Sequence, residues 1–122
     1  MELMDIVAEL KNASVQMPEE KIDQFIEAVD THERIFVYGT GRSGLMLKAL
    51  AMRLMQMGYQ SYVVGETTTP SVGKGDLLIV ASASGETQSV CSAADDGAKQ
   101  GTDVLVITGS KESTLSRNHE PL

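Results

Sequence analysis

The spacing of apolar residues predicts two helices at the start of the chain. In the first segment the apolar positions follow the i, i+3, i+4, i+7 pattern of an amphipathic helix over residues 2–13; they are Leu3, Ile6, Val7 and Leu10. Pro18 followed by two glutamates is a helix-start signal. A further apolar stripe extends that second helix to about Asp30.

Short runs rich in β-branched residues then alternate with helical patterns. The runs predict strands at residues 34–38, 61–65, 77–81 and 103–108. The helical patterns cover residues 43–57 and 87–100. The run at 77–81 is apolar throughout, as expected in the middle of a parallel sheet. The alternation predicts a single α/β domain, in which helices within residues 1–30 precede an α/β core at 34–122.

The predicted helix at 43–57 is apolar on most sides. One stripe contains Leu47, Leu50, Leu54 and Met57, and Met46, Ala49 and Met52 extend it around the helix. This distribution predicts a helix buried on more than one face. Two interpretations are open: one face meets the sheet and another meets a partner subunit, or methionines fill the core all round.

Composition narrows the class of protein. The 122 residues carry a formal net charge of −7, which argues against a nucleic-acid or anionic-membrane surface. Cys91 is the only cysteine, and the two histidines are far apart, so neither an internal disulfide nor a metal site is expected. No segment has the length of a membrane span, and the first residues lack a signal-peptide pattern. We therefore expect a cytoplasmic protein.

Two segments rich in glycine and hydroxyl groups carry the candidate chemistry. Residues 39–44 (GTGRSG) and 82–87 (SASGET) each follow a predicted strand and open a predicted helix. Backbone N–H groups at a helix start, together with nearby hydroxyls, suit a phosphate. Both segments would lie at the carboxyl ends of parallel strands, where such sheets bind ligands, and so would Glu66 and Thr67. We expect a phosphorylated small molecule, with Gly41, Arg42 and Ser43 as candidates in the first segment.

Other interpretations of these residues are open. Residues 39–44 also match G-x-G-x-x-G, and Glu66 follows about twenty residues later, which is the pattern of a dinucleotide-binding fold. Ser82 or Ser84 could simply cap a helix. Glu86 could serve the helix dipole. Arg42 and Lys48 could be solvated surface charges, although Arg42 is the better site candidate.

The chain resembles the sugar isomerase (SIS) domain family, and within it the 6-phospho-3-hexuloisomerases of the ribulose monophosphate pathway. The resemblance rests on residues 35–44 (IFVYGTGRSG), 51–55 (AMRLM), 63–70 (VVGETTTP) and 82–87 (SASGET). It implies a three-layer, flavodoxin-like α-β-α sandwich, a homotetramer or homodimer, and no redox cofactor. It also implies that the second segment binds the substrate phosphate through Ser82, Ala83, Ser84, Gly85, Glu86 and Thr87, and that Ser43 contributes from the first.

Such enzymes interconvert D-arabino-hex-3-ulose 6-phosphate and D-fructose 6-phosphate through an enediol. The family's base is expected to be a glutamate near a C-terminal helix, and this sequence ends before that helix and before the family's fifth strand. Glu66 is the fallback base, because it falls at the correct end of the sheet. The alternative activities are a non-catalytic phosphosugar-binding module and a nucleotide-binding Rossmann domain.

Overall fold

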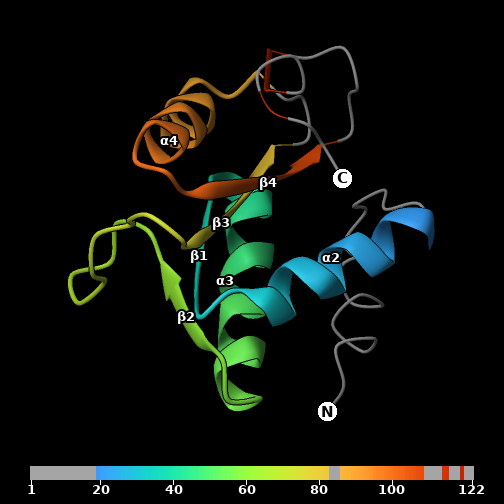
Figure 1. Ribbon diagram of the computed structural model, residues 1–122. Coiled ribbons are helices and arrows are strands. Elements are labelled where there is room, and N and C mark those ends of the chain that lie inside the picture. Colours follow the sequence, from blue (N-terminus) through green and yellow to red (C-terminus); the bar gives the residue numbers. More distant parts are fainter. Residues whose placement is uncertain (1–18, 83–85, 109–113, 116–118, 120–122) are drawn as a thin grey trace.

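The computed structural model describes residues 19–82, 86–108, 114–115 and 119. Within them lie three helices and four strands, which Figure 1 labels: α2 (Glu19–Thr31), β1 (Arg34–Gly39), α3 (Gly41–Gln56), β2 (Gln60–Val63), β3 (Leu77–Ser82), α4 (Gln88–Lys99) and β4 (Asp103–Thr108). Each of these elements begins and ends within two residues of the bounds that the sequence predicted. The helix predicted at 2–13 lies outside the described residues.

The four strands form one parallel sheet in the order β2-β1-β3-β4. The prediction of a parallel α/β sheet is therefore confirmed. The third strand lies beside the first, as in flavodoxin-like sheets, whereas in the dinucleotide-binding order it lies outside the second. The next strand in the chain, β2, lies on one side of β1 and β3 lies on the other, which makes the carboxyl ends of β1 and β3 the switch point of the sheet.

Helices cover both faces of the sheet (Figure 1). On one face, α2 and α3 pack on alternate residues of β1 and β3; the buried side chains there include Phe25, Val29, Ile35, Val37, Leu47, Leu50, Leu54, Leu77 and Ile79. On the other face, α4 packs on the intervening residues; the buried side chains there are Phe36, Leu78, Val80, Val90, Ala94, Val106 and Leu115. Period-two alternation along each strand thus builds two cores.

Burial of α3 differs from the prediction. Its buried residues form a single stripe, made of Gly44, Leu47, Leu50, Ala51 and Leu54. Leu45, Met52 and Met55 are 68%, 51% and 56% exposed. Ala49 is exposed as well. Within this chain α3 is therefore buried on one face, and the interpretation that methionines fill the core all round is wrong. The interpretation that a second face meets a partner subunit stays a prediction.

A glycine decides how closely α4 packs. A Cβ at Gly97 would lie 2.8 Å from Leu78 Cδ2, so only glycine lets the helix approach β3 at this point without moving that side chain. Val90 and Ala94 are buried beside it, whereas Ala98 is exposed. The buried face of α4 therefore runs through Val90, Ala94 and Gly97.

An ion pair lies at the amino edge of the sheet, opposite the strand ends that carry the candidate residues. Arg34 donates to Asp76 through Nε (3.0 Å) and Nη2 (2.5 Å), and the backbone N–H of Gly73 also donates to that carboxylate (2.8 Å). The hydrogen bonds from Arg34 hold the pKa of Asp76 below its usual value, even though burial opposes the shift.

Within the described part of the chain, no helix has the length and apolarity needed to cross a membrane.

Candidate functional site

Register brings the candidate segments together at the carboxyl edge of the sheet. Gly39 at the end of β1 pairs with Ala81 in β3, and Ser82 pairs with Thr108 in β4. On the other side of β1, the N–H of Val64, just past β2, donates to the carbonyl of Val37 (2.9 Å). The carboxyl ends of β1, β2 and β3 therefore lie side by side.

The turn between β1 and α3 depends on close backbone contact. A Cβ on Gly44 would lie 2.5 Å from the carbonyl oxygen of Gly39, so no larger residue fits there. Gly41 has a φ of +58°, a left-handed conformation that favours glycine. The glycines of this segment thus bring the start of α3 against the end of β1.

The structure places the first segment partly inside a helix. Because α3 begins at Gly41, both Gly41 and Arg42 belong to its first turn and not to a loop. Arg42 is exposed and Ser43 is half-buried. Thr40 is the N-cap but makes no capping hydrogen bond through its side chain. The first turn of α3 therefore presents N–H groups that its N-cap side chain does not satisfy.

The second segment has a hydroxyl pair at its two ends. Ser82, buried at the end of β3, is hydrogen-bonded to Thr87 through their hydroxyl oxygens (2.9 Å). Thr87 is the N-cap of α4, yet its side chain makes no hydrogen bond to the helix. Its hydroxyl therefore bonds to Ser82, at the other end of the segment, and does not cap α4. Ala83, Ser84 and Gly85 lie outside the described residues.

Glu86 has a contact that the sequence did not indicate. It directly precedes Thr87, the N-cap of α4, and so lies just outside the first turn of that helix. Its carboxylate accepts two hydrogen bonds from Thr114, one from the backbone N–H and one from the hydroxyl, both 2.7 Å long. Glu86 thus ties the second segment to the chain that follows β4.

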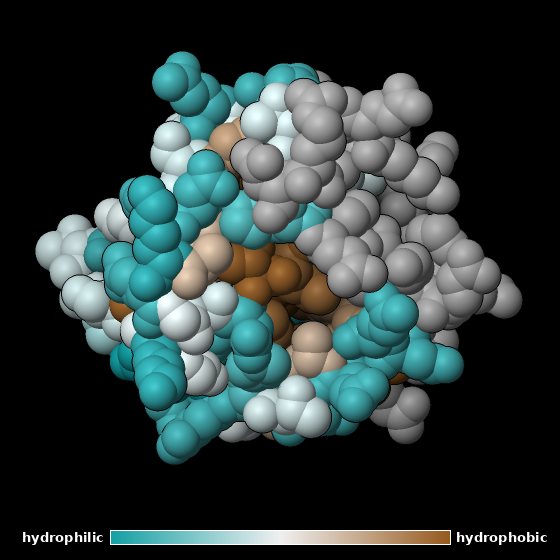
Figure 2. Space-filling view, turned by 45° about the horizontal axis from the view of Figure 1, so that its top comes forward, coloured by the Kyte–Doolittle hydropathy of each residue, from teal (hydrophilic) through white to brown (hydrophobic). Residues whose placement is uncertain are grey.

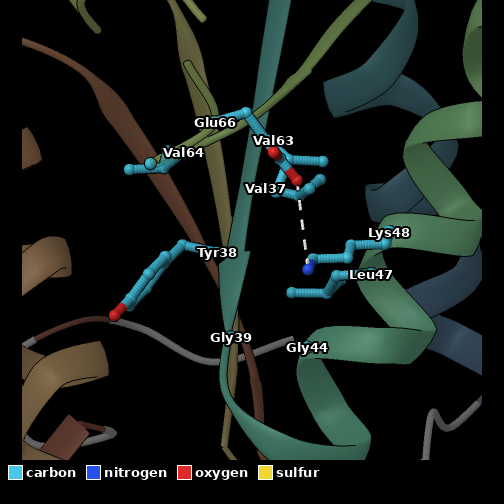
Figure 3. Close-up of a pocket in the computed structure, with 10 residues that line it drawn as sticks. Val37, Tyr38, Gly39, Gly44, Leu47, Lys48, Val63, Val64 and Glu66 are labelled. Carbon is cyan, nitrogen blue, oxygen red and sulfur yellow. Dashed lines mark ion pairs between the residues drawn. The ribbon is translucent and has the colours of Figure 1, made fainter.

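A cavity of about 270 Å³ opens where β1, β2 and α3 meet (Figure 3). Two of its lining residues are charged, Lys48 and Glu66, and the Lys48 ammonium lies 3.9 Å from the Glu66 carboxylate. The other lining residues are Val37, Tyr38, Gly39, Gly44, Leu47, Val63, Val64 and Gly65. Thr67 is exposed in the turn after Glu66 and does not line the cavity. The lining thus combines apolar side chains with two charged ones, and small-molecule sites likewise combine apolar side chains with a few polar groups.

The face that comes forward in Figure 2 is hollowed. Hydrophobic side chains form the floor of the hollow, and hydrophilic side chains surround much of its rim. The view tilts the top of Figure 1 forward, where β3 and β4 end.

Two residues at this edge, Thr114 and Lys48, were not predicted as site residues from the sequence. No motif marks Thr114 as the partner of Glu86. Lys48 lies four residues after Gly44, hence on the same face of α3, and that spacing could have placed it beside the turn.

Among the described residues, no three histidine, cysteine or acidic side chains come together in a way that could hold a metal.

Comparison with known sequences gives a family and several named relatives. Residues 29–120 match the SIS domain family. The chain is 39% identical over 113 residues to the 3-hexulose-6-phosphate isomerase of Bacillus subtilis, covering 93% of this chain and 61% of that protein. It is 45% identical over 87 residues to the enzyme of the same name from Methanocaldococcus jannaschii, covering 71% and 48% respectively. The chain spans about half to two thirds of the length of the curated relatives it matches.

Solved structures show the same fold. A hypothetical protein of Methanococcus jannaschii, whose crystal structure was reported to infer 3-hexulose-6-phosphate isomerase function, has a TM-score of 0.79 at 35% identity, over 95% of this chain and 65% of that one. The sugar isomerase domain of an RpiR transcription factor from Sphaerobacter thermophilus has a TM-score of 0.73 at 21% identity, over 97% and 69%. At the lower identity the likeness shows the fold alone.

Proposed function

The chain belongs to the SIS domain family, and from that premise we propose that it interconverts D-arabino-hex-3-ulose 6-phosphate and D-fructose 6-phosphate. The observation that carries the proposal is the pairing of β1 with β3, because it brings together, at the switch point of the sheet, the ends of the two strands that precede the glycine- and hydroxyl-rich segments. Relatives named 3-hexulose-6-phosphate isomerase at 37–45% identity support the choice of substrate.

The second segment is the proposed phosphate site. Ser82 and Thr87 hold its two ends together, and the start of α4 adds N–H groups whose partial charge favours an anion. Ser84 and Gly85, which the resemblance assigns to phosphate binding, lie between these ends in the sequence. Ser43, half-buried at the start of α3, is the proposed contribution of the first segment. Arg42 and Gly41 remain further candidates there.

The isomerisation needs a base that moves one proton between neighbouring carbons. Removal of the proton from C3 of fructose 6-phosphate sends the C–H electron pair toward the C2 ketone and forms a 2,3-enediol. Return of the proton to C2 leaves the ketone at C3. Glu66 is the proposed base in this chain because its carboxylate faces the cavity beside β1. No redox change occurs, so the reaction needs no redox cofactor.

Proton NMR of fructose 6-phosphate in D₂O tests the proposal. With the protein present, we expect the C3 proton signal to disappear, because the enediol returns solvent deuterium to that carbon. Binding without exchange would contradict the isomerase and leave a phosphosugar-binding module. Binding of NAD in preference to the sugar phosphate would overturn both and favour the Rossmann alternative.

Ser84→Ala tests the phosphate assignment. We expect it to weaken fructose 6-phosphate binding by about 1–3 kcal/mol, the range for losing a hydrogen bond to a charged group. Titration calorimetry gives the affinity. Ser92→Ala, at an exposed position on α4, is the matched control. An affinity equal to that of the control would remove Ser84 from the site.

We also propose that the protein self-associates, as a homodimer or homotetramer in the cytoplasm. The exposed side chains of Leu45, Met52 and Met55 on α3 support this, because large apolar groups gathered on one helix are typical of an interface. Helices on both faces of the sheet likewise support the three-layer arrangement of the complete domain.

A further inference from the structure

Lys48 places a positive charge at the cavity beside β1. It extends from α3 one turn after Gly44 and lines the cavity together with Glu66. Figure 3 shows the Glu66 carboxylate pointing toward the Lys48 ammonium, with Val37 and Leu47 beside them. The cavity thus has one cationic and one anionic group, and both reach it from neighbouring elements.

The ion pair between these residues contributes little to the fold. Their side chains are 55% and 54% exposed, and the 3.9 Å between Nζ and Oε1 is too long for a hydrogen bond. Exposed pairs of this kind stabilise a protein weakly or not at all. Neither side chain is therefore locked to the other, and a ligand oxygen can enter between them.

We propose that Lys48 stabilises the negative oxygen that forms during isomerisation, while Glu66 takes the proton. This rests on the proposed function. As Glu66 removes the C3 proton, the electron pair of that C–H bond forms the C2–C3 double bond, and the C2 carbonyl π pair moves onto oxygen as an enediolate. The Lys48 ammonium donates a hydrogen bond to that oxygen. The hydroxyl proton on the C3 oxygen then moves to the C2 oxygen, so that the negative charge lies on the C3 oxygen. When Glu66 returns its proton to C2, an electron pair of the C3 oxygen forms the C3 carbonyl, the C2–C3 π pair takes the proton, and the C2 oxygen is left as a hydroxyl.

The position of Lys48 relative to the phosphate site fits an open-chain substrate. Glu66 follows β2 and the second segment follows β3, with β1 between them. Two strand spacings separate these ends by about 10 Å. An extended hexulose phosphate spans such a distance, so its phosphate can lie at β3 while its ketone end reaches the cavity. Arg42 does not line the cavity, which leaves Lys48 as the only cation among its lining residues.

Ligand affinities of three variants test this assignment. We would compare Lys48→Met, which keeps the side chain's length without its charge, with Lys48→Arg, which keeps the charge. Lys99→Met, in the last turn of α4, is the matched control. The probes are inorganic phosphate, fructose 6-phosphate and a phosphorylated sugar hydroxamate, whose anionic oxygen imitates the enediolate.

For Lys48→Met we expect a loss of hydroxamate affinity of about 10- to 100-fold, with the affinity for inorganic phosphate nearly unchanged. Lys48→Arg restores part of the loss, and Lys99→Met binds all three as the wild type does. Equal loss on phosphate and hydroxamate, or no loss on either, overturns the role of Lys48. A wild type that binds neither sugar ligand refutes the proposed function itself, which separates the two failures.

Discussion

Gly44 is the residue on which the entry into α3 depends. Its Cα lies against the end of β1, and a Cβ there would lie 2.5 Å from the Gly39 carbonyl oxygen and 2.9 Å from its carbon. Both partners are backbone atoms, so neither can rotate away as a side chain would. The four-residue interval between Gly39 and Gly44 in the sequence therefore reflects a packing requirement as well as a candidate site.

Gly44→Ala tests this contact. We expect a decrease in the free energy of unfolding of about 1–3 kcal/mol, because the added methyl forces strand and helix apart. Urea denaturation gives the value. Gly73→Ala is the control, since the nearest atom to its Cβ would be Asp76 Oδ2 at 3.8 Å. Equal stability of the two variants would show that the turn relaxes at no cost.

Asp76→Asn tests the ion pair at the amino edge. Because the folded-state pKa of Asp76 is lowered, its stabilising effect is fully present above the unfolded value of 3.8 and is lost as the pH falls through the lower, folded value. We expect the variant to be less stable by on the order of 1–3 kcal/mol near pH 7. In urea denaturation the difference should shrink as the pH falls below 3.8.

Asp96→Asn, at an exposed position on α4, is the control for the Asp76 variant. It should change the free energy of unfolding little, both near pH 7 and below pH 3.8. If the difference in unfolding free energy between Asp76→Asn and the wild type did not depend on pH, the negative charge of Asp76 would not be the source of its stabilising effect.

Among the elements, α2 is tied to the sheet by the residue that follows it. His32 donates through Nδ1 to the carbonyl of Ala28 (2.6 Å) and through Nε2 to Asp103 at the start of β4 (2.7 Å). Both ring nitrogens thus face acceptors, which favours the charged imidazolium. The bond to Ala28 lies within the end of α2, but the link to Asp103 in β4 spans 71 positions and has no local signal in the sequence.

The pKa of His32 tests this link. Burial lowers that pKa, but the hydrogen bonds to Asp103 and Ala28 more than offset it, so the pKa lies above 6.5. The stabilising effect is therefore fully present below the unfolded value and is lost as the pH rises through the folded one. Titration of the His32 ring protons by NMR should give a lower midpoint in Asp103→Asn. An unchanged midpoint would show that Asp103 does not hold the imidazolium.

Element bounds were predictable because they depend on local pattern. The four strands follow from β-branched apolar runs, and α4 ends just before Gly101. The start of α3 was placed two residues too late, because Gly41 and Arg42 carry no apolar signal. Only the contact of Gly44 with Gly39 shows why the helix must begin so close to the strand.

At the scale of the whole molecule, the exposed apolar side of α3 predicts an assembly. The double substitution Met52→Glu and Met55→Glu should convert an oligomer into a monomer of 13.1 kDa, because burying two new carboxylates in an interface is costly. Light scattering gives the mass. The unfolding midpoint of a dilute sample should change little, since both side chains point away from the core.

Ser92→Glu, exposed on α4, is the control and should leave the mass of the assembly unchanged. A wild type that is already monomeric, or a double variant that still assembles, would contradict the assignment of the interface to α3.

The sequence by itself determined the α/β class, the two glycine- and hydroxyl-rich segments, and their position at strand ends, because periodicity and turn chemistry are local properties. Only the tertiary structure decided the order β2-β1-β3-β4, the bond between Ser82 and Thr87, the attachment of Glu86 to Thr114, and the meeting of Lys48 with Glu66. Each of these depends on which strands pair and how closely a helix approaches them. Such contacts join residues that no local pattern relates.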